Sequence, residues 1–283
     1  MQTSKFQQLV GIIFTIVILA FILVHHNPSH PGQLNSSQEA IMHGLDYVDK
    51  SPDVSPVQWL LMDYLARKFE LDSKFLAANR NFQLPTEPQA AAEFQTYRRI
   101  AYPDQLVDSL PSDNDPTNRM VMEALHCDHI PLPADFTQLI QSNTDAGGYQ
   151  LTHVAFSLER MNENGCPLPA DQDQKLRDQL KVGMVDIIDN PNTDPETGTG
   201  PDLRYEALAM LMHIGYRDQV KQSWIEQIIK EQSSDGGWKN RFDATEDNDH
   251  ATVLALWALL EYSQPGVASE PMLHHPVPSV ASR

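Results

Sequence analysis

Apolar residues recur at intervals of three and four positions through most of the chain between residues 37 and 263. This spacing places them on one side of an α-helix, and the alternating β-branched runs that indicate strands are scarce. The pattern predicts an all-α fold with about ten helices. We expect them at residues 37–50, 56–70, 87–101, 116–126, 134–142, 150–162, 170–189, 203–214, 219–232 and 250–263.

The N-terminal residues have a different pattern. Residues 6–24 carry no charge and are almost wholly apolar after Gln8. As a helix, this stretch would span roughly 28 Å, close to the hydrocarbon thickness of a bilayer. It is not followed by the small-residue site of a cleaved signal peptide, which favours a single transmembrane anchor. Lys5 precedes the span and no Lys or Arg follows it until Lys50, so we expect a cytoplasmic N-terminus and a main domain outside the cytoplasm, as in the periplasm of a bacterial inner membrane.

Two segments beside the helical region have the composition of irregular chain. Residues 27–36 are polar and contain Pro, Ser and Asn, which is typical of a linker. Residues 264–283 contain four prolines and no apolar period, so we expect a flexible tail. The predicted organisation is therefore an anchor (1–26), a linker (27–36), a helical domain (37–263) and a tail (264–283).

The charge of the chain excludes one class of partner. There are 20 Lys and Arg residues against 38 Asp and Glu residues, a formal net charge of -18. A charge of this sign repels phosphate backbones, so nucleic acid is not an expected partner.

The two cysteines can be interpreted in two ways. In an oxidising compartment, a bridge between Cys127 and Cys166 would close a loop of about 40 residues and contribute about 4 kcal/mol. Two buried free thiols are the alternative.

Two loops share the same order of residue types. QSSDGGW (232–238) and QSNTDAGGY (141–149) each place a glycine pair before an aromatic residue. In the first loop, Gly236 and Gly237 allow the positive φ of a sharp turn. We expect Trp238 to fold back and hold adjacent helices together.

These loops and the helices that follow them resemble a known repeat. QSSDGGW followed by DHATVLALWALLEY (249–262) is similar to the QW-type repeat shared by squalene-hopene cyclases and protein prenyltransferase β subunits. QSNTDAGGYQLTHVAFSLERM (141–161) resembles a degenerate second copy, and DLRYEALAMLMHIG (202–215) a third inner-type helix. The resemblance covers the C-terminal half of the chain and implies an α/α toroid, an array of helical hairpins around a cavity. Ten helices are fewer than the twelve of a full double ring, so the ring is expected to be incomplete.

The resemblance also implies a candidate site. If the repeats align, His153, Glu206 and His250 lie near the starts of three inner helices and face the cavity. Together with Asp249, they can form a proton-transfer set, because a carboxylate partner orients an imidazole and raises its pKa.

Four aromatic residues of the repeats are candidates for the cavity lining. Tyr149, Tyr205, Trp238 and Trp257 can bind an apolar or sugar ligand there. The alternative is core packing, which is commoner for aromatic residues at helical spacing.

No cofactor is assigned. His250 resembles the zinc-binding histidine of prenyltransferase β subunits, but the matching Asp-x-Cys pair is missing and Asp202 is the only acid at a comparable helix start. The segment EDND (246–249) differs from the Asp-x-Asp-Asp acid motif of class II terpene cyclases and fits helix capping better. Calcium in the loop 243–249 is a further alternative. HCDH (126–129) is typical of a helix terminus.

Two functions remain open at this point. The first is a membrane-tethered domain that binds a protein partner or an extended ligand, peptide, glycan or lipid-like, in its concave cavity. The second is a cyclase-, lyase- or transferase-like enzyme that acts on a glycan or isoprenoid through the cavity histidines and carboxylates. The absence of an intact acid motif or zinc set favours binding.

Overall fold

The computed structural model describes residues 31–52, 54–81, 83–113, 115–191, 200–267 and 270–273 of the 283-residue chain. These ranges contain ten α-helices, four short 3-10 helices and no strand, which confirms the predicted all-α class. The α-helices are α2 (Pro31–Lys50), α3 (Pro56–Lys68), α4 (Pro88–Tyr97), α5 (Pro116–Leu125), α6 (Phe136–Ala146), α7 (Gly148–Glu163), α8 (Ala170–Asp189), α9 (Gly200–His213), α10 (Gln222–Glu231) and α11 (Asp249–Ser263).

The helix starts follow from capping residues in the sequence. The side chain of Asp115 accepts hydrogen bonds from the second and third residues of α5, as expected for an N-cap. Helix α11 begins one residue before its predicted start at residue 250. Asn248 is its N-cap and Asp249 is its first helical residue. Helix α2 begins at Pro31, so residues 31–36, expected in a linker, are helical.

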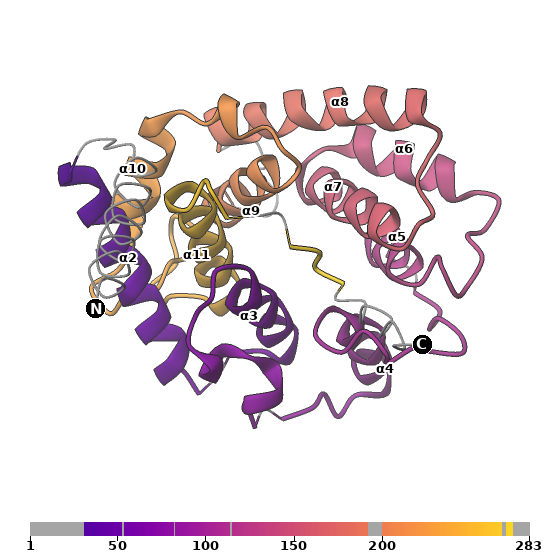
Figure 1. Ribbon diagram of the computed structural model, residues 1–283, viewed down its shortest axis with the longest axis horizontal. Coiled ribbons are helices and arrows are strands. Elements are labelled where there is room, and N and C mark those ends of the chain that lie inside the picture. Colours follow the sequence, from indigo (N-terminus) through magenta and orange to yellow (C-terminus); the bar gives the residue numbers. More distant parts are fainter. Residues whose placement is uncertain are drawn as a thin grey trace, which may run out of the picture.

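The helices form two groups (Figure 1). Six of them contact one another in a closed series, in which α3 packs on α4, α4 on α5, α5 on α7, α7 on α9, α9 on α11 and α11 on α3. We call these the inner helices. Helices α2, α6, α8 and α10 lie on the outer side of this series. Helices α9 and α11 are buried on nearly all sides, because neighbours cover both their inner and their outer faces.

The loop that contains Trp238 connects three helices. Gly236 has a φ of 100°, and a side chain there would meet the backbone oxygen of His43 in α2 at 2.4 Å. The indole of Trp238 is fully buried and donates a hydrogen bond to the backbone oxygen of Ile228 in α10. The amide of Gln232 donates to the backbone of α2 and to that of the loop itself. The glutamine, glycine and tryptophan together therefore fix α2 and α10 beside α11.

The second glycine-aromatic loop is simpler. Gly147 and Gly148, with φ values of 72° and 55°, join α6 directly to α7. Within the described ranges, the side chain of Gln141 donates to Asp145 on its own helix, whereas that of Gln232 donates to the backbone of another helix.

The C-terminal ends of several inner helices meet at one place, which we call the C-terminal end of the inner group. Cys127, just after α5, forms a disulfide with Cys166, just after α7, so the alternative of free thiols is excluded. The side-chain amide of Asn164 donates to the last turn of α5. Buried Lys68 of α3 pairs with Glu261 of α11 at 2.5 Å.

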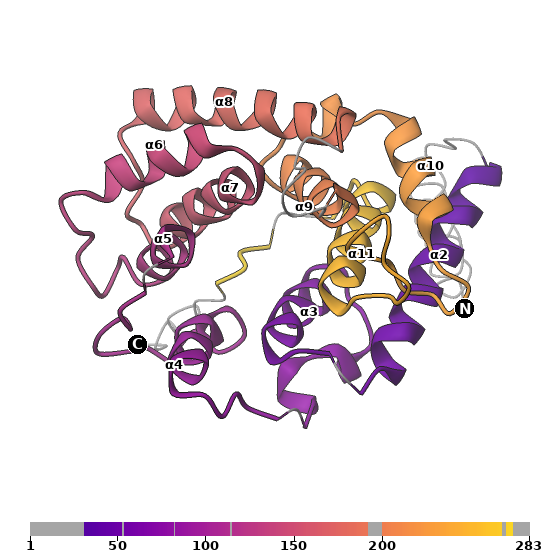
Figure 2. The same ribbon diagram turned by 180° about the vertical axis from the view of Figure 1, so that it is seen from behind.

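Residues 270–273 correct the expectation of a wholly flexible tail. Met272 and Leu273 are fully buried. The segment crosses between α9 and α4 in both views (Figures 1 and 2). Periodicity could not indicate this, because the segment is held by contacts with residues more than 100 positions away, among them Arg160 and Glu163.

The predicted membrane span, residues 6–24, lies outside the described residues. Among the helices that the structure does describe, none has the length and apolar character needed to cross a bilayer.

Candidate functional site

A cavity of about 320 Å³ lies among the six inner helices. Its floor is largely apolar and aromatic, and each of the six helices contributes at least one polar side chain to its lining. The apolar lining residues are Val57, Leu61, Ile100, Val121, Phe156, Met210, Leu254 and Trp257. The polar ones are Gln58, Glu93, Tyr97, Asn118, His153, Glu206 and His250. A ligand pocket of this kind combines apolar walls with a few polar groups that fix orientation.

The three residues expected to face a cavity, His153, Glu206 and His250, all border this one. His153 Nδ1 lies 2.8 Å from the backbone oxygen of Tyr149 and 3.4 Å from Glu206 Oε1. Because both oxygens accept hydrogen bonds, Nδ1 carries the proton. In the neutral ring, His153 Nε2 is therefore a free acceptor.

His250 has a different electrostatic environment. Its Nδ1 lies 3.0 Å from both carboxylate oxygens of buried Asp202 in α9, which also accepts a hydrogen bond from the hydroxyl of Tyr149. Burial opposes the charged ring, but the Asp202 hydrogen bond and charge, with Glu206 and Asp249, raise the pKa of His250 to about 9. The ring is therefore positively charged at neutral pH, and its Nε2 is a donor.

Two buried oxygens at the cavity have no hydrogen-bond partner among the described residues. They are Oε2 of Glu206 and Oε1 of Gln58, which belong to side chains on α9 and α3. These residues are only 7% and 8% exposed. Most buried polar atoms in folded proteins are paired, so the two side chains beside this cavity each carry an acceptor that the fold leaves unsatisfied.

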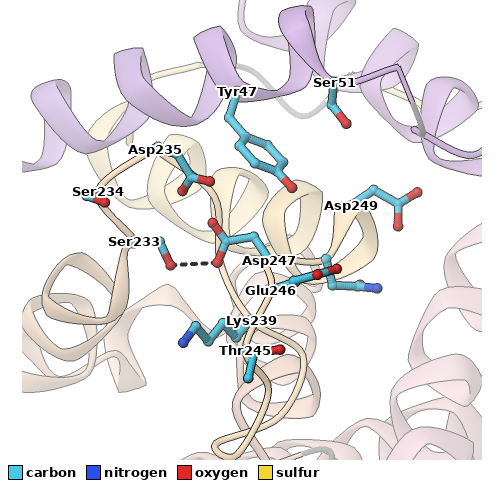
Figure 3. A pocket seen from close by; sticks show the side chains of 11 residues that line it. Tyr47, Ser51, Ser233, Ser234, Asp235, Lys239, Thr245, Glu246, Asp247 and Asp249 are labelled. Atoms are coloured by element: carbon cyan, nitrogen blue, oxygen red, sulfur yellow. Dashed lines mark hydrogen bonds between the residues drawn. The ribbon is translucent and has the colours of Figure 1, made fainter.

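Asp249 does not border the cavity with His250. Its carboxylate accepts a hydrogen bond from the backbone N–H of Ser55 at 2.8 Å and lines a separate, polar pocket of about 780 Å³ (Figure 3). Its effect on the cavity is limited to its charge, which helps to raise the pKa of His250.

The polar pocket in Figure 3 lies between α2 and the loop that precedes α11. Burial and a hydrogen bond with Asp235 raise the pKa of Asp247 to about 6, while the same hydrogen bond lowers the pKa of Asp235. Below about pH 6 the two carboxyl groups therefore share one proton, which resides on Asp247. Across the described part of the chain, no three His, Cys, Asp or Glu side chains are placed to hold a metal ion, so the calcium alternative gains no support here.

The four candidate aromatic residues occupy different environments. Trp257 borders the cavity and donates a hydrogen bond to Glu261 at 3.0 Å. Tyr205 is buried and donates to Glu231 at the end of α10, and Trp238 is buried beside α2 and α10. Tyr149 donates to Asp202 beneath His250. Tyr205 and Trp238 are therefore core residues, while Trp257 can contact a ligand directly.

His126 in the HCDH segment is a structural residue. It is fully buried just after α5, and its Nε2 lies 3.1 Å from the backbone oxygen of Thr96. Burial lowers its pKa, so the ring is neutral. Asp128 accepts two hydrogen bonds from Arg99, both at 2.6 Å.

Sequence reasoning missed the half of the cavity that α3, α4 and α5 contribute. Gln58, Glu93, Tyr97 and Asn118 lie in these helices, before the region covered by the toroid resemblance. The sequence identifies Asp202 as an acid at a helix start but does not identify it as the partner of His250. Its position in the first turn of α9, matching that of His250 in α11, is the signal that pairs the two residues.

Comparison of the chain with protein-family models, curated proteins and solved structures found no match.

Proposed function

We propose that this chain is a ligand-binding domain tethered to a membrane by residues 6–24. The closed series of inner helices and the outer position of α2, α6, α8 and α10 support an incomplete α/α toroid. The ligand site is the cavity among the inner helices. Its ligand is an extended molecule, such as a peptide, glycan or lipid-like chain, that inserts one end there.

The observation that carries this proposal is the unpartnered Oε2 of Glu206. An unsatisfied buried polar atom costs about 1–3 kcal/mol. A ligand that donates a hydrogen bond to Glu206 and to Gln58 would remove this cost. The apolar walls, including Phe156 and Trp257, fit the aliphatic or aromatic part of the same ligand.

The cavity therefore favours the end of a ligand that carries hydrogen-bond donors, an amine or a hydroxyl. Glu206 and Glu93 border it with acidic groups, and Asp202 lies directly behind His250. An anionic ligand would meet these carboxylates, although charged His250 offsets part of the repulsion.

Isothermal titration calorimetry of the purified full chain with benzylamine, benzyl alcohol and benzoate tests this proposal. The three probes share a ring and differ in the polar group. We expect benzylamine to bind most tightly, with a Kd on the order of 1 mM because the probe is small. Benzoate is expected not to bind.

The substitution Glu206→Gln should weaken benzylamine binding and reduce its advantage over benzyl alcohol. Glu226→Gln changes an exposed glutamate on α10 and serves as the matched control. Equal binding of benzylamine and benzoate, or no effect of Glu206→Gln, would exclude the proposed site.

A second function is supported by the difference between the two histidines. His250 presents a charged Nε2–H donor, while His153, whose Nδ1 faces the backbone oxygen of Tyr149, presents its Nε2 at the same cavity. Such a pair suits general acid and general base roles in proton transfer on a glycan or isoprenoid. This function predicts that His153→Gln and His250→Gln each abolish turnover of a polyuronide or squalene while the chain remains folded. A wild-type chain that turns over neither substrate class leaves binding as the function.

A further inference from the structure

The segment Glu270–Leu273 is recognised through its main chain as well as its side chains. Arg67 of α3 donates hydrogen bonds to the backbone oxygens of Pro271 and Met272, at 3.5 and 3.0 Å. Glu163 of α7 accepts from the backbone N–H groups of Met272 and Leu273, at 3.1 and 2.9 Å. This is how proteins bind an extended peptide, because main-chain groups give affinity and side-chain pockets give selectivity.

The side chains of the segment fill the C-terminal end of the inner group. Met272 and Leu273 are both 0% exposed. The sulfur of Met272 lies 2.7 Å from a guanidinium nitrogen of Arg160, which is itself fully buried. Two adjacent apolar side chains are therefore part of what the site recognises.

The pairing of Arg160 is incomplete. Its guanidinium also contacts Glu163 and His213, but its Nε has no partner among the described residues. A thioether sulfur is only a weak acceptor for a charged donor. A peptide with an oxygen acceptor at the position of Met272 would satisfy Arg160 better than the chain's own segment does.

The same arginine connects this site to the cavity. The guanidinium of Arg160 lies 4.8 Å from the ring centre of Phe156, which borders the cavity floor. The bound segment therefore lies one layer of side chains below the floor, at the opposite end of the inner helices.

We propose that Arg67, Arg160 and Glu163 form a peptide-binding site, the peptide clamp, that the chain's own residues 270–273 occupy. The ligand class is an extended peptide in which a proline is followed by a residue with an apolar or oxygen-bearing side chain and then by an apolar residue. The N–H groups of these last two residues both bond to Glu163. A peptide from another chain binds the clamp when it displaces this segment. This site is distinct from the cavity, so it does not depend on the proposed ligand of Glu206.

While residues 270–273 occupy the peptide clamp, a competing peptide cannot bind there. A short tether gives a bound segment an effective concentration on the order of mM. A peptide added at lower concentration should therefore bind only after the segment has been released. Leu273→Glu releases it, because the substitution places a carboxylate at a fully buried apolar position.

The experiment uses the full chain and a fluorescein-labelled synthetic peptide with the sequence of residues 267–276. Fluorescence anisotropy should show roughly tenfold tighter peptide binding to the Leu273→Glu chain than to wild type. Val182→Glu, at a valine that is 66% exposed on α8, is the matched control and should bind like wild type. Adding Glu163→Gln to Leu273→Glu should weaken binding again. A peptide with glutamine in place of Met272 should bind more tightly than the methionine peptide, because its oxygen can accept from Arg160.

Equal binding to wild type and to a folded Leu273→Glu chain would overturn the proposal, as would no binding to either. Hydrogen exchange of the wild-type chain decides the question if Leu273→Glu does not fold. The amides of Met272 and Leu273 should be protected and should exchange faster in the Glu163→Gln chain. Exchange at the rate of a free peptide in wild type would contradict the clamp.

Discussion

The two ends of the inner helices differ in how completely their buried carboxylates are paired. At the C-terminal end, buried Glu261 pairs with Lys68 at 2.5 Å, and Glu163 pairs with Arg160 at 2.7 Å. At the cavity, buried Asp202 pairs with charged His250 at 3.0 Å, but Glu206 lies 3.4 Å from the ring of His153 and one of its oxygens has no partner among the described residues. The cavity thus contains one incompletely paired carboxylate, whereas Glu261 and Glu163 at the C-terminal end each have a cationic partner.

This difference distinguishes the C-terminal end, whose contacts stabilise the fold, from the cavity, whose polar groups are available for function. The C-terminal end also contains the Cys127–Cys166 disulfide and the buried segment 270–273, which both hold the helices together. At the cavity, the Asp202–His250 pair contributes to stability, but Glu206 and Gln58 each have a buried oxygen without a partner among the described residues, which is a cost in stability. Such a cost is typical of functional sites, because groups arranged for a ligand are not arranged for the fold alone.

The largest effect is expected from breaking the ion pair at the C-terminal end. Lys68→Met leaves Glu261 buried without a cation and should lower the free energy of unfolding by about 3–5 kcal/mol. Urea denaturation measures this change. Lys50→Met breaks the exposed pair with Asp46, 73% and 57% exposed, and should change stability by less than about 1 kcal/mol. Equal effects of the two substitutions would show that Lys68 and Glu261 are not buried as described.

At the cavity, the removal of a buried charge is expected to change stability in the opposite direction. Glu206→Gln removes a buried charge that lacks a full set of partners, so it should leave stability unchanged or raise it by about 1 kcal/mol. Glu261→Gln makes the same chemical change at the C-terminal end and should destabilise the fold, because it leaves Lys68 without its counter-charge. Thermal unfolding of both variants without ligand gives the comparison. Destabilisation of equal size would remove the distinction between the two ends.

A further effect is a pH dependence of stability that arises from His250. Its folded pKa of about 9 lies above the value of about 6.5 for an unfolded histidine, so the charged ring stabilises the folded state. That stabilisation is fully present below about pH 6.5 and is lost as the pH rises through about 9. His250→Gln should flatten this part of the stability profile. Asp202→Asn should flatten it as well, since Asp202 supplies the main partner.

The sequence was sufficient to predict all ten helices, because periodicity and capping residues are local signals. The repeat register also placed His153, Glu206 and His250 on three helices that border one cavity. It could not separate Trp257, at the cavity, from Trp238, in the core, because burial depends on which helices later pack around each ring. The burial of Met272 and Leu273 was not predictable, since two apolar residues in a proline-rich segment carry no period and their partners lie far away in the chain.

Crystals of the full chain soaked in benzylamine test the central claim most directly. The account predicts an amine nitrogen within about 3.2 Å of Glu206 Oε2, with the ring against Phe156 and Trp257. Benzylamine bound only in the separate polar pocket beside Asp247, with the cavity unchanged, would contradict it.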